Sequence, residues 1–358
     1  MAGPGGSGSG RIFMASRLPA RLAENAEKLL AALPVARWHP AAVAFAAKRP
    51  VRETWGVALS GGADSLALLL LLWAQWPRRR RLVALHFDHR LRGRESRADA
   101  AFCRRVCAAL GVKLVLGEWT QAHREASEAE ARAARLAFLQ KHARVLWFGH
   151  QQDDIAESLF MRVARGSGTG GLAAPRPVQA FGRGRWHVRP LLTLKKAEIV
   201  EALRAAAIPW REDSTNAGAA FFRNRVRQSV LPAWCAVAGR DALAGAARTR
   251  ELLEEDDAAL EAWLAEIHPM DERGGLDLTR LAGRPRALWR RALHRWLLAH
   301  PEAGEISRQG FEMLLAAALR GNATRQSLGR QGFAVIREGR LRFQKTGKTS
   351  RKFQRRAN

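Results

Sequence analysis

The sequence predicts an α/β protein with a doubly wound parallel sheet and a second, mainly helical domain. Two observations support this prediction. Short apolar segments alternate with segments of helical periodicity up to about residue 215, and parallel strands need such crossover connections. From about residue 216 the alternation gives way to long helical periods. We therefore expect four parts: a flexible leader with a leading helix (1–50), the sheet domain (51–215), a helical domain that ends in a hairpin (216–345) and a basic tail (346–358).

The elements follow one another in a regular order. A leading helix is predicted over 18–33 from its apolar spacing. Short apolar runs predict buried strands at 57–59, 82–87, 112–116 and 145–149. Helical periods predict helices at 66–73, 97–110, 128–140 and 195–207, and further helices at 241–267, 285–299 and 307–319. Apolar and polar residues alternate over 326–343 on both sides of Glu338-Gly339, which indicates the hairpin.

Composition limits the class of protein. The chain has 358 residues, of which 47% are hydrophobic, and this is enough for ordinary cores in two domains. Lys and Arg number 60 against 33 Asp and Glu, so the formal net charge is +27. Such an excess favours a polyanionic partner, with nucleic acid as the first candidate. The alternative is a compositional bias that places arginine on ordinary solvated faces.

Cysteine usage and hydropathy indicate a cytoplasmic protein. Cys103, Cys107 and Cys235 are too few for a disulfide framework, and the sequence contains no C-x-x-C pair for zinc or iron–sulfur chemistry. The longest apolar run, 66–76, is interrupted by a glutamine and is too short to cross a membrane. We expect no membrane partner, and no obligate protein partner is evident.

A loop of small residues joins the first strand to the first buried helix. Its sequence is Ser60-Gly61-Gly62-Ala63-Asp64-Ser65. Backbone N–H groups at a helix N-terminus form a cradle for an anion, and glycines let the backbone approach a ligand closely. Ser60 and Ser65 can add hydroxyl donors, and Ser65 can also cap the helix. A bare strand-to-helix turn is the alternative, but the full S-G-G-x-D-S string favours phosphate binding by all six residues.

Two further polar clusters follow strands of the predicted sheet. Residues 88–92 come after the second strand, and residues 150–157 come after the fourth. Ligands of doubly wound sheets bind beyond the carboxyl ends of the strands, so both clusters and the small-residue loop should meet in one crevice. Asp153 and Asp154 are good helix caps in their own right. In a nucleotide crevice they are also candidates for Mg²⁺ ligands or proton acceptors.

Five ordered motifs together resemble the tRNA(Ile)-lysidine synthases, which are Rossmann-like pyrophosphate-loop ATPases. These motifs lie at 60–65, 86–92, 149–157, 165–172 and 212–232. The resemblance covers about 51–232 well and the rest of the chain more loosely. We expect 51–215 to be the ATP-binding catalytic domain and the helical domain 216–345 to bind tRNA. It implies that lysine is attached to C2 of the wobble cytidine of an isoleucine tRNA with a CAU anticodon, through an adenylylated cytidine. ATP, Mg²⁺ and free L-lysine are the implied cofactors and co-substrate, and AMP and pyrophosphate are the implied products.

The resemblance also implies roles for individual residues. Asp154 or His150 would take the proton from the lysine amine, and Arg132 would contact the α-phosphate or the cytosine. A surface ion pair with Glu128 is the alternative for Arg132. Asp64 and Asp153 would hold Mg²⁺. Side chains implied to bind RNA are Arg92, Arg223, Asn224, Arg225 and Arg227.

The chain departs from the family pattern around Arg132. Ser127 and Leu136 stand where the family commonly has Asn and Tyr. The chain is also short beside the longer family members. Within the superfamily, tRNA thiolation is the closest alternative function, and it ordinarily needs cysteines. The alternative from another class is a non-catalytic RNA-binding protein that retains the ATPase fold.

Overall fold

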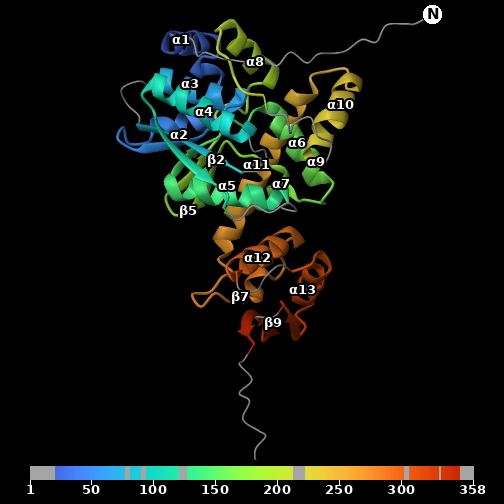
Figure 1. Ribbon diagram of the computed structural model, residues 1–358. Coiled ribbons are helices and arrows are strands. Elements are labelled where there is room, and N and C mark those ends of the chain that lie inside the picture. The colour runs from blue at the N-terminus through green and yellow to red at the C-terminus, as the bar shows by residue number, and fades with distance from the viewer. Residues whose placement is uncertain are drawn as a thin grey trace, which may run out of the picture. The chain divides into compact units, whose positions relative to one another are not determined.

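Two compact units make up the chain, Met1–Glu254 and Glu255–Asn358 (Figure 1). The computed structural model describes residues 21–76, 81–89, 94–120, 127–212, 222–301, 306–329 and 332–346. Several sequence predictions fall outside these ranges: the leader up to residue 20, Arg92, the motif residues 213–216 and the basic tail from residue 347.

The first unit is built on a six-stranded sheet with the strand order β3-β2-β1-β4-β6-β5. Its strands are β1 (Thr54–Ala58), β2 (Arg81–Asp88), β3 (Lys113–Glu118), β4 (Val145–Trp147), β5 (Val178–Gly182) and β6 (Arg185–Val188). All neighbouring pairs from β3 to β6 are parallel, which confirms the predicted doubly wound sheet. The edge strand β5 runs antiparallel to β6. The sequence analysis missed this hairpin because β5 is largely exposed and contains no apolar run of strand length.

Helices cover both faces of the sheet (Figure 1). They are α1 (Leu22–Ala32), α2 (Pro40–Ala47), α3 (Ala63–Gln75), α4 (Arg94–Leu110), α5 (Glu128–His142), α6 (Gln152–Val163), α7 (Thr169–Leu172) and α8 (Lys196–Ala205), with a 3₁₀ turn η1 (Val35–Arg37). Side chains of β1 point alternately to the two faces. Trp55 and Val57 join the core formed with α1, α3, α4 and α8, whereas Ala58 packs with Leu139 of α5. Helix α3 is completely buried over Leu66–Leu72, so the loop that precedes it starts from a rigid element.

The first unit continues past residue 215, where the sequence analysis ended the sheet domain. The helical segments that follow are α9 (Phe222–Arg225), the π-helical η3 (Val226–Val230), α10 (Leu231–Val237) and α11 (Ala242–Ile267). Val226, Leu231 and Ala246 pack against α6 in a separate apolar cluster. This burial ties the segment to the sheet unit, although its helical periodicity alone suggested a new domain. Pro232 stands at the start of α10, where its missing N–H costs nothing, so the helix continues to Val237.

The second unit packs two helices against a small antiparallel sheet. Its elements are η4 (Leu278–Leu281), α12 (Arg286–Leu298), α13 (Arg308–Arg320), β7 (Leu276–Asp277), β8 (Thr324–Ser327), β9 (Gly332–Arg337) and β10 (Arg340–Lys345). The strand order is β7-β10-β9-β8, and the β9–β10 hairpin turns at Glu338-Gly339 as predicted. Trp296 is fully buried in the core that joins the helices to Ile336 and Leu341 of the sheet.

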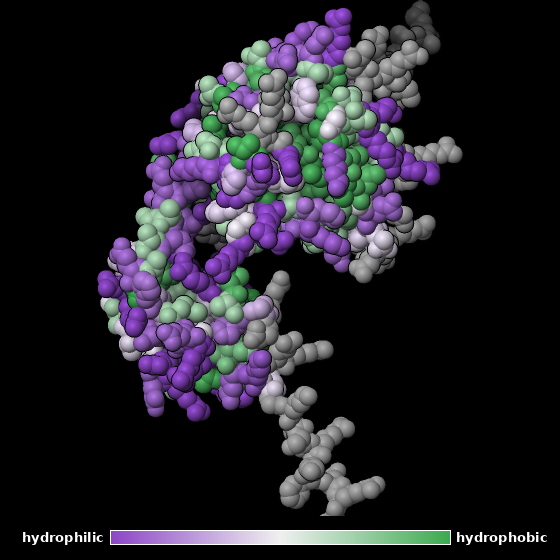
Figure 2. Space-filling model, turned by 90° about the vertical axis from the view of Figure 1, so that its left-hand side faces the viewer, coloured by the Kyte–Doolittle hydropathy of each residue, from purple (hydrophilic) through white to green (hydrophobic). Residues whose placement is uncertain are grey.

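Hydrophilic residues predominate on the face of the molecule drawn in Figure 2, and hydrophobic residues gather there in smaller areas. None of the helices in the described ranges has an apolar stretch long enough to span a lipid bilayer.

Candidate active site

The loop between β1 and α3 is held in shape by its own serines. Ser65 Oγ accepts a hydrogen bond from Ser60 N at 3.1 Å and donates one to Gly62 O at 3.1 Å. The hydroxyl oxygens of Ser60 and Ser65 lie 3.0 Å apart. Gly61 has a φ of +92°, which strongly favours glycine, and its carbonyl accepts a hydrogen bond from Arg211 N at 3.0 Å. These hydrogen bonds fix the shape of the loop.

Within the described residues, the N-cap position of α3 provides no side-chain cap for the backbone N–H groups of the first turn. Gly62 is the N-cap residue, and a glycine offers no side-chain acceptor. The suggestion that Ser65 caps this helix was wrong, because Ser65 lies within the first turn and bonds back to the loop. Uncapped N–H groups at the positive end of a 13-residue helix favour an anion. This geometry suits the phosphate binding predicted for Ser60–Ser65.

Gly149 brings the end of β4 directly against this turn. A Cβ atom at position 149 would lie 2.6 Å from the carbonyl oxygen of Asp64 and 3.0 Å from the backbone nitrogen of Ser65. Only a glycine permits so close an approach of the two backbones. The next residue, His150, is thereby positioned beside the loop.

Asp64 is the carboxylate of the first turn. Its burial, supported by the negative charge of Asp154, raises its pKa to about 6, while Lys196 opposes the shift. Within the described part of the chain, the buried Oδ1 atom of Asp64 has no hydrogen-bond partner. Mg²⁺ in nucleotide sites is held by one or two carboxylates and by substrate phosphates, so this orphaned oxygen fits a Mg²⁺ ligand. The described residues contain no cluster of three side chains suited to a metal, so phosphates would have to complete the coordination.

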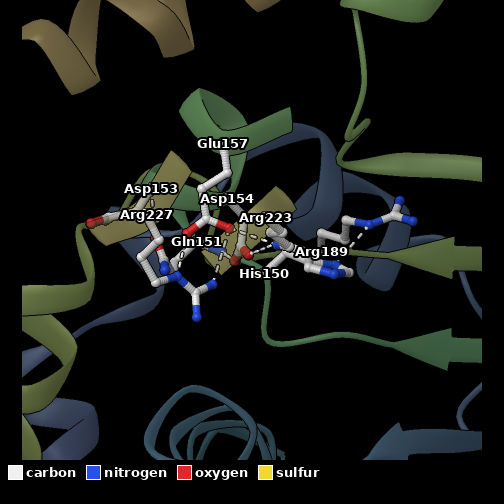
Figure 3. Close-up of polar contacts among 8 residues, drawn as sticks. All are labelled: His150, Gln151, Asp153, Asp154, Glu157, Arg189, Arg223 and Arg227. Atoms are coloured by element: carbon white, nitrogen blue, oxygen red, sulfur yellow. Dashed lines mark hydrogen bonds and ion pairs between the residues drawn. The ribbon is translucent and has the colours of Figure 1, made fainter. Parts of the chain in front are cut away.

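Asp153 and Asp154 both have structural partners at the N-terminus of α6. Gln151 is the N-cap; its side chain accepts from Asp153 N at 2.5 Å, and Asp154 Oδ2 accepts from Gln151 N at 2.9 Å. Asp153 Oδ2 accepts from Lys196 N at 3.0 Å, at the start of α8. The other oxygen of Asp154 is paired with Arg223 (Figure 3). The capping alternative weighed for these aspartates is thus present, and their roles as metal ligand and base stay predictions.

Glu157, one turn further along α6, binds two arginines. Its side chain is 1% exposed and accepts from Arg223 Nε at 2.6 Å and from Arg227 Nε at 2.5 Å (Figure 3). Sequence reasoning assigned these two arginines to RNA, yet in the structure they point at α6 carboxylates. The signal that could have found them is the i, i+4 spacing of Arg223 and Arg227 on one helical face.

The other residues predicted to bind RNA lie in different surroundings. Asn224 is buried, whereas Arg225 is exposed, with its guanidinium 5.8 Å from the ring centroid of Phe222. Of the predicted RNA-binding residues in the described ranges, Arg225 is the most accessible to a large ligand. The prediction for these residues remains open.

His150 is bound by an arginine that sequence reasoning missed. Arg189 Nε donates to His150 Nδ1 at 3.1 Å (Figure 3). Arg189 is 8% exposed, and its guanidinium carbon lies 5.5 Å from the centroid of the Phe148 ring. Burial lowers the pKa of His150 well below its usual range, and the charges of Arg189 and Arg223 add to this effect. A neutral ring that accepts at Nδ1 carries its proton on Nε2, so Nε2 of His150 is a hydrogen-bond donor. Arg189 directly follows β6. Its position at the carboxyl end of a strand is the feature of the sequence that could have identified it as a site residue.

Arg132 adds positive charge to the same region. Its charge lowers the pKa of His150 and of Arg189, and it also lowers the pKa of Arg135, which is reduced mainly by burial. The side chain of Arg132 is exposed on α5, while Arg135 is half-buried. Ser127 caps α5 by accepting from a backbone N–H, so the departure from the family pattern at this position preserves a cap. The arrangement suits an anionic ligand beside the loop.

A cavity of about 190 Å³ lies next to the α6 carboxylates. Asp153 and Glu157 contribute acidic groups to its lining, Lys196 and Arg227 contribute cations, and Leu231 and Leu243 contribute apolar surface. Arg227 is paired with Glu157, so Asp153 is the acidic group left for a ligand. This mixture suits a small molecule that carries both charged ends and an aliphatic chain.

Cys103 and Cys107 lie in the core beside the loop, and a Cβ atom at position 61 would be 3.4 Å from the Sγ of Cys103. Both thiols are buried in the main core, and burial raises the pKa of each; the pKa of Cys107 rises to about 12. Buried thiols of this kind are poor nucleophiles. They offer no support for sulfur transfer, which was the closest alternative function.

Comparison with known proteins places this site in a family. Residues 40–234 match the family model described as PP-loop domain. The tRNA(Ile)-lysidine synthase of Solibacter usitatus is 43% identical over 216 residues, which cover 59% of this chain and 47% of that protein. The tRNA(Ile)-lysidine synthase of Geobacter sulfurreducens is 37% identical over 275 residues, which cover 72% of this chain and 56% of that protein. The chain thus spans about half the length of the curated relatives it matches.

A solved structure shows a more distant likeness. The U34-tRNA thiolase NcsA from Methanococcus maripaludis, solved with its 4Fe-4S cluster, is 17% identical, with a TM-score of 0.48 and coverage of 64% of this chain and 78% of that one. So low a similarity carries no information on function. The family model, in contrast, covers more than half of the chain and includes the loop, His150 and the α6 carboxylates. The chain therefore belongs to the PP-loop family, within which it is related to the tRNA(Ile)-lysidine synthases.

Proposed function

We propose that this protein uses ATP to attach lysine to C2 of the wobble cytidine of an isoleucine tRNA with a CAU anticodon. The observation that carries the proposal is the preorganised Ser60–Ser65 loop at the uncapped start of α3, in a chain whose relatives bear the name of this reaction. ATP is cleaved to AMP and pyrophosphate, and the product is lysidine.

The loop binds the phosphates of ATP. Its backbone N–H groups and the positive end of α3 compensate the phosphate charge, and the Ser60 hydroxyl adds a donor. Asp64, with its orphaned oxygen, is the residue that would hold Mg²⁺, which would supply further charge compensation to the phosphates. Asp153 is the second candidate ligand, through the oxygen that does not accept from Lys196.

Positive and donor groups act on the adenylylated cytidine. The C2 oxygen of cytidine is a poor leaving group until it is joined to the α-phosphate. Arg132 and Arg189 are the cations that stabilise the charge of this phosphate, and His150 donates from Nε2. When the amine attacks C2, a C–N bond forms, the bond between C2 and the phosphate oxygen breaks, and its electron pair leaves with AMP.

The cavity beside α6 receives lysine. Asp153 attracts an ammonium group, Leu231 and Leu243 contact the methylenes, and Lys196 and Arg227 attract the carboxylate. The attacking amine must lose a proton, and Asp154 is the candidate acceptor. The single Nδ1 lone pair of His150 already accepts from Arg189, whereas each carboxylate oxygen of Asp154 keeps a second lone pair beside its bond to Gln151 or Arg223.

The decisive test measures the nucleoside product. An isoleucine tRNA transcript with a CAU anticodon is incubated with the protein, ATP, Mg²⁺ and lysine, digested to nucleosides and analysed by mass spectrometry. We expect a cytidine with the mass of one added lysine, less one water, and one AMP for each modified tRNA. Reactions without lysine, or with a tRNA whose wobble base is uridine, serve as controls. Unmodified cytidine together with tight tRNA binding would instead identify a non-catalytic RNA-binding protein.

A further inference from the structure

The sheet of the second unit has one face that the core does not use. Ala334, Ile336 and Leu341 point to the core beneath the helices. Neighbouring side chains of a strand alternate between faces, so the residues between these positions lie on the outer face. Gln326 of β8 pairs with Ala334 and so should point to the core face. Its side-chain amide donates to Gly310 O of α13, which agrees with this assignment.

Arginines and one aromatic ring share this outer face. In the strand register, Arg325 of β8 pairs with Val335 of β9, which pairs with Arg342 of β10. Phe333 lies on the same face, two residues before Val335 on β9. At the other end of the strand, beside the hairpin turn, Arg337 of β9 pairs with Arg340 of β10. We call this set the arginine face; its members are Arg325, Phe333, Val335, Arg337, Arg340 and Arg342.

Arg325 and Phe333 form a stacked pair within the arginine face. The guanidinium carbon of Arg325 lies 3.5 Å from the ring centroid of Phe333. Phe333 remains half-buried and Arg325 exposed. A rigid planar pair of this kind offers a surface on which an unpaired base can stack.

The charge of this face is less neutralised than that of the helices in the same unit. On α12, Arg286 and Arg290 bind Glu312, while Arg291 and Arg295 bind Glu261. Within the described part of the unit, by contrast, Arg325, Arg337 and Arg342 form no ion pair with a carboxylate, and Arg340 has Asp277 as its electrostatic neighbour. These arginines of α12 are thus neutralised by carboxylates, whereas most of those described on the sheet are not. The positive charge of the sheet is therefore available to an anionic partner.

We infer that the arginine face binds RNA, with its guanidinium groups on phosphates and the Arg325–Phe333 pair stacked against an unpaired base. The inference rests on the proposed function, which requires a tRNA. Planar guanidinium groups bind phosphate oxygens through two parallel hydrogen bonds. Arg325 and Arg342 lie on the two strands that flank β9. Neighbouring strands are about 4.8 Å apart, so the backbones of these two residues are about 10 Å from each other, and their side chains can contact separate phosphates. An acidic protein partner would not use the stacking surface.

The test compares two double variants that remove equal charge from the full-length chain. Arg325→Ala with Arg342→Ala removes two cations from the arginine face. Arg286→Ala with Arg295→Ala removes two from the helices and leaves each carboxylate with another arginine. Fluorescence anisotropy measures binding of a labelled isoleucine tRNA between about 50 and 200 mM salt, the range in which phosphate contacts show themselves. Unfolding midpoints show whether each variant is folded.

We expect the face variant to lose at least about tenfold in tRNA affinity near 100 mM salt, and its salt slope to fall by about two, one for each lost phosphate contact. The helix variant should change affinity by less than about twofold. Phe333→Ala should weaken binding at least about fivefold with the salt slope unchanged, because stacking releases no counterions. Equal losses in the two double variants, or none in the face variant, overturn the inference.

This experiment separates the inference from the proposed reaction. If the face variant binds tRNA normally and forms lysidine, the proposed reaction is supported and the RNA-binding role of the arginine face is rejected. If the wild type binds tRNA but forms no lysidine, and the face variant loses tRNA binding, the RNA-binding role of the arginine face is supported and the proposed reaction is rejected. If the face variant fails to fold, Arg325→Lys replaces it, since it keeps the charge but loses the planar stack, and its affinity should fall with the salt slope retained.

Discussion

Glu157 lies fully buried on α6 and accepts a hydrogen bond from Nε of Arg223 across 2.6 Å. The same carboxylate binds Arg227, so one buried anion joins the segment 222–227 to the helix whose first turn carries Asp153 and Asp154. These ion pairs join the helical segment 222–227 to the candidate active site. It also explains why these arginines occur in a helical segment that the sequence analysis assigned to RNA binding.

Replacing Glu157 by alanine should cost about 3 to 5 kcal/mol in the free energy of unfolding. Removing one partner of a buried ion pair leaves the other charges uncompensated, and here two arginines lose their acceptor. Glu201→Ala, at an exposed position of α8, is the control and should change stability by less than about 0.5 kcal/mol. Urea unfolding at pH 7 measures both. A loss below about 1 kcal/mol for Glu157→Ala would mean that water replaces the carboxylate.

Gly149→Ala should weaken ATP binding more than tenfold. The new Cβ would lie 2.6 Å from the carbonyl oxygen of Asp64, so the first turn of α3 and the end of β4 must separate. Overpacking of this kind typically costs about 1 to 3 kcal/mol in stability. Calorimetric titration with ATP measures the affinity.

Gly245→Ala is the matched control for that substitution. A Cβ at position 245, within α11, meets no atom within 4 Å, and alanine is favoured over glycine in a helix. ATP affinity should therefore remain unchanged. Equal affinities for the wild type and Gly149→Ala would show that the close approach of the two backbones has no part in forming the cradle.

Asp64→Asn should abolish AMP formation without lowering stability at pH 7.5. Burial raises the pKa of Asp64 from 3.8 to about 6, so the folded protein holds this proton more tightly than the unfolded chain. The contribution of Asp64 to stability is complete below pH 3.8 and is lost as the pH rises through about 6. Asparagine resembles the protonated acid and should avoid this loss, which amounts to about 1 to 3 kcal/mol. Thermal unfolding with a chelator present, at pH 5 and pH 7.5, gives the comparison; AMP formation by the variant would remove Asp64 from the mechanism.

His187 should make the protein less stable as the pH falls. The ring is 6% exposed and stacked on Phe181 with centroids 4.1 Å apart, and burial, helped by Arg189, lowers its pKa to about 4. Between pH 6.5 and 4 the unfolded chain binds a proton that the folded chain does not, so this contribution is present above about pH 6.5 and is lost as the pH falls through about 4.

The matching variant is His187→Gln, which cannot titrate. The stability difference between wild type and variant should shrink by about 1 to 3 kcal/mol between pH 7.5 and pH 4.5. His150 titrates in the same direction but is present in both proteins, so it cancels in the difference. Parallel stability curves would show that His187 stays accessible to protons in the native state.

Sequence patterns predicted the sheet and its loop because these depend on local order. Alternating apolar runs and helical periods indicate parallel strands with crossovers, and the structure confirms them. The Ser60–Ser65 string lies after β1 as expected, and its last three residues form the first turn of the buried helix α3. Local reasoning went wrong over Ser65, because the first turn of α3 starts three residues earlier than capping by Ser65 would require. The exposed strand β5 gave no signal, since nothing on it must be buried.

The sequence by itself determined the parallel sheet, the small-residue loop at the carboxyl end of β1 and the presence of His150, Asp153 and Asp154 at the carboxyl end of β4. These features follow from periodicity and from residue types that only short stretches of chain need to satisfy. Only the tertiary structure decided which charges pair: Arg189 with His150 across 39 positions, and Arg223 with Glu157 across 66. The physical reason is desolvation. A buried charge must have a partner, and several arginines of the chain could serve, so the choice depends on which of them the packed helices bring within hydrogen-bond distance.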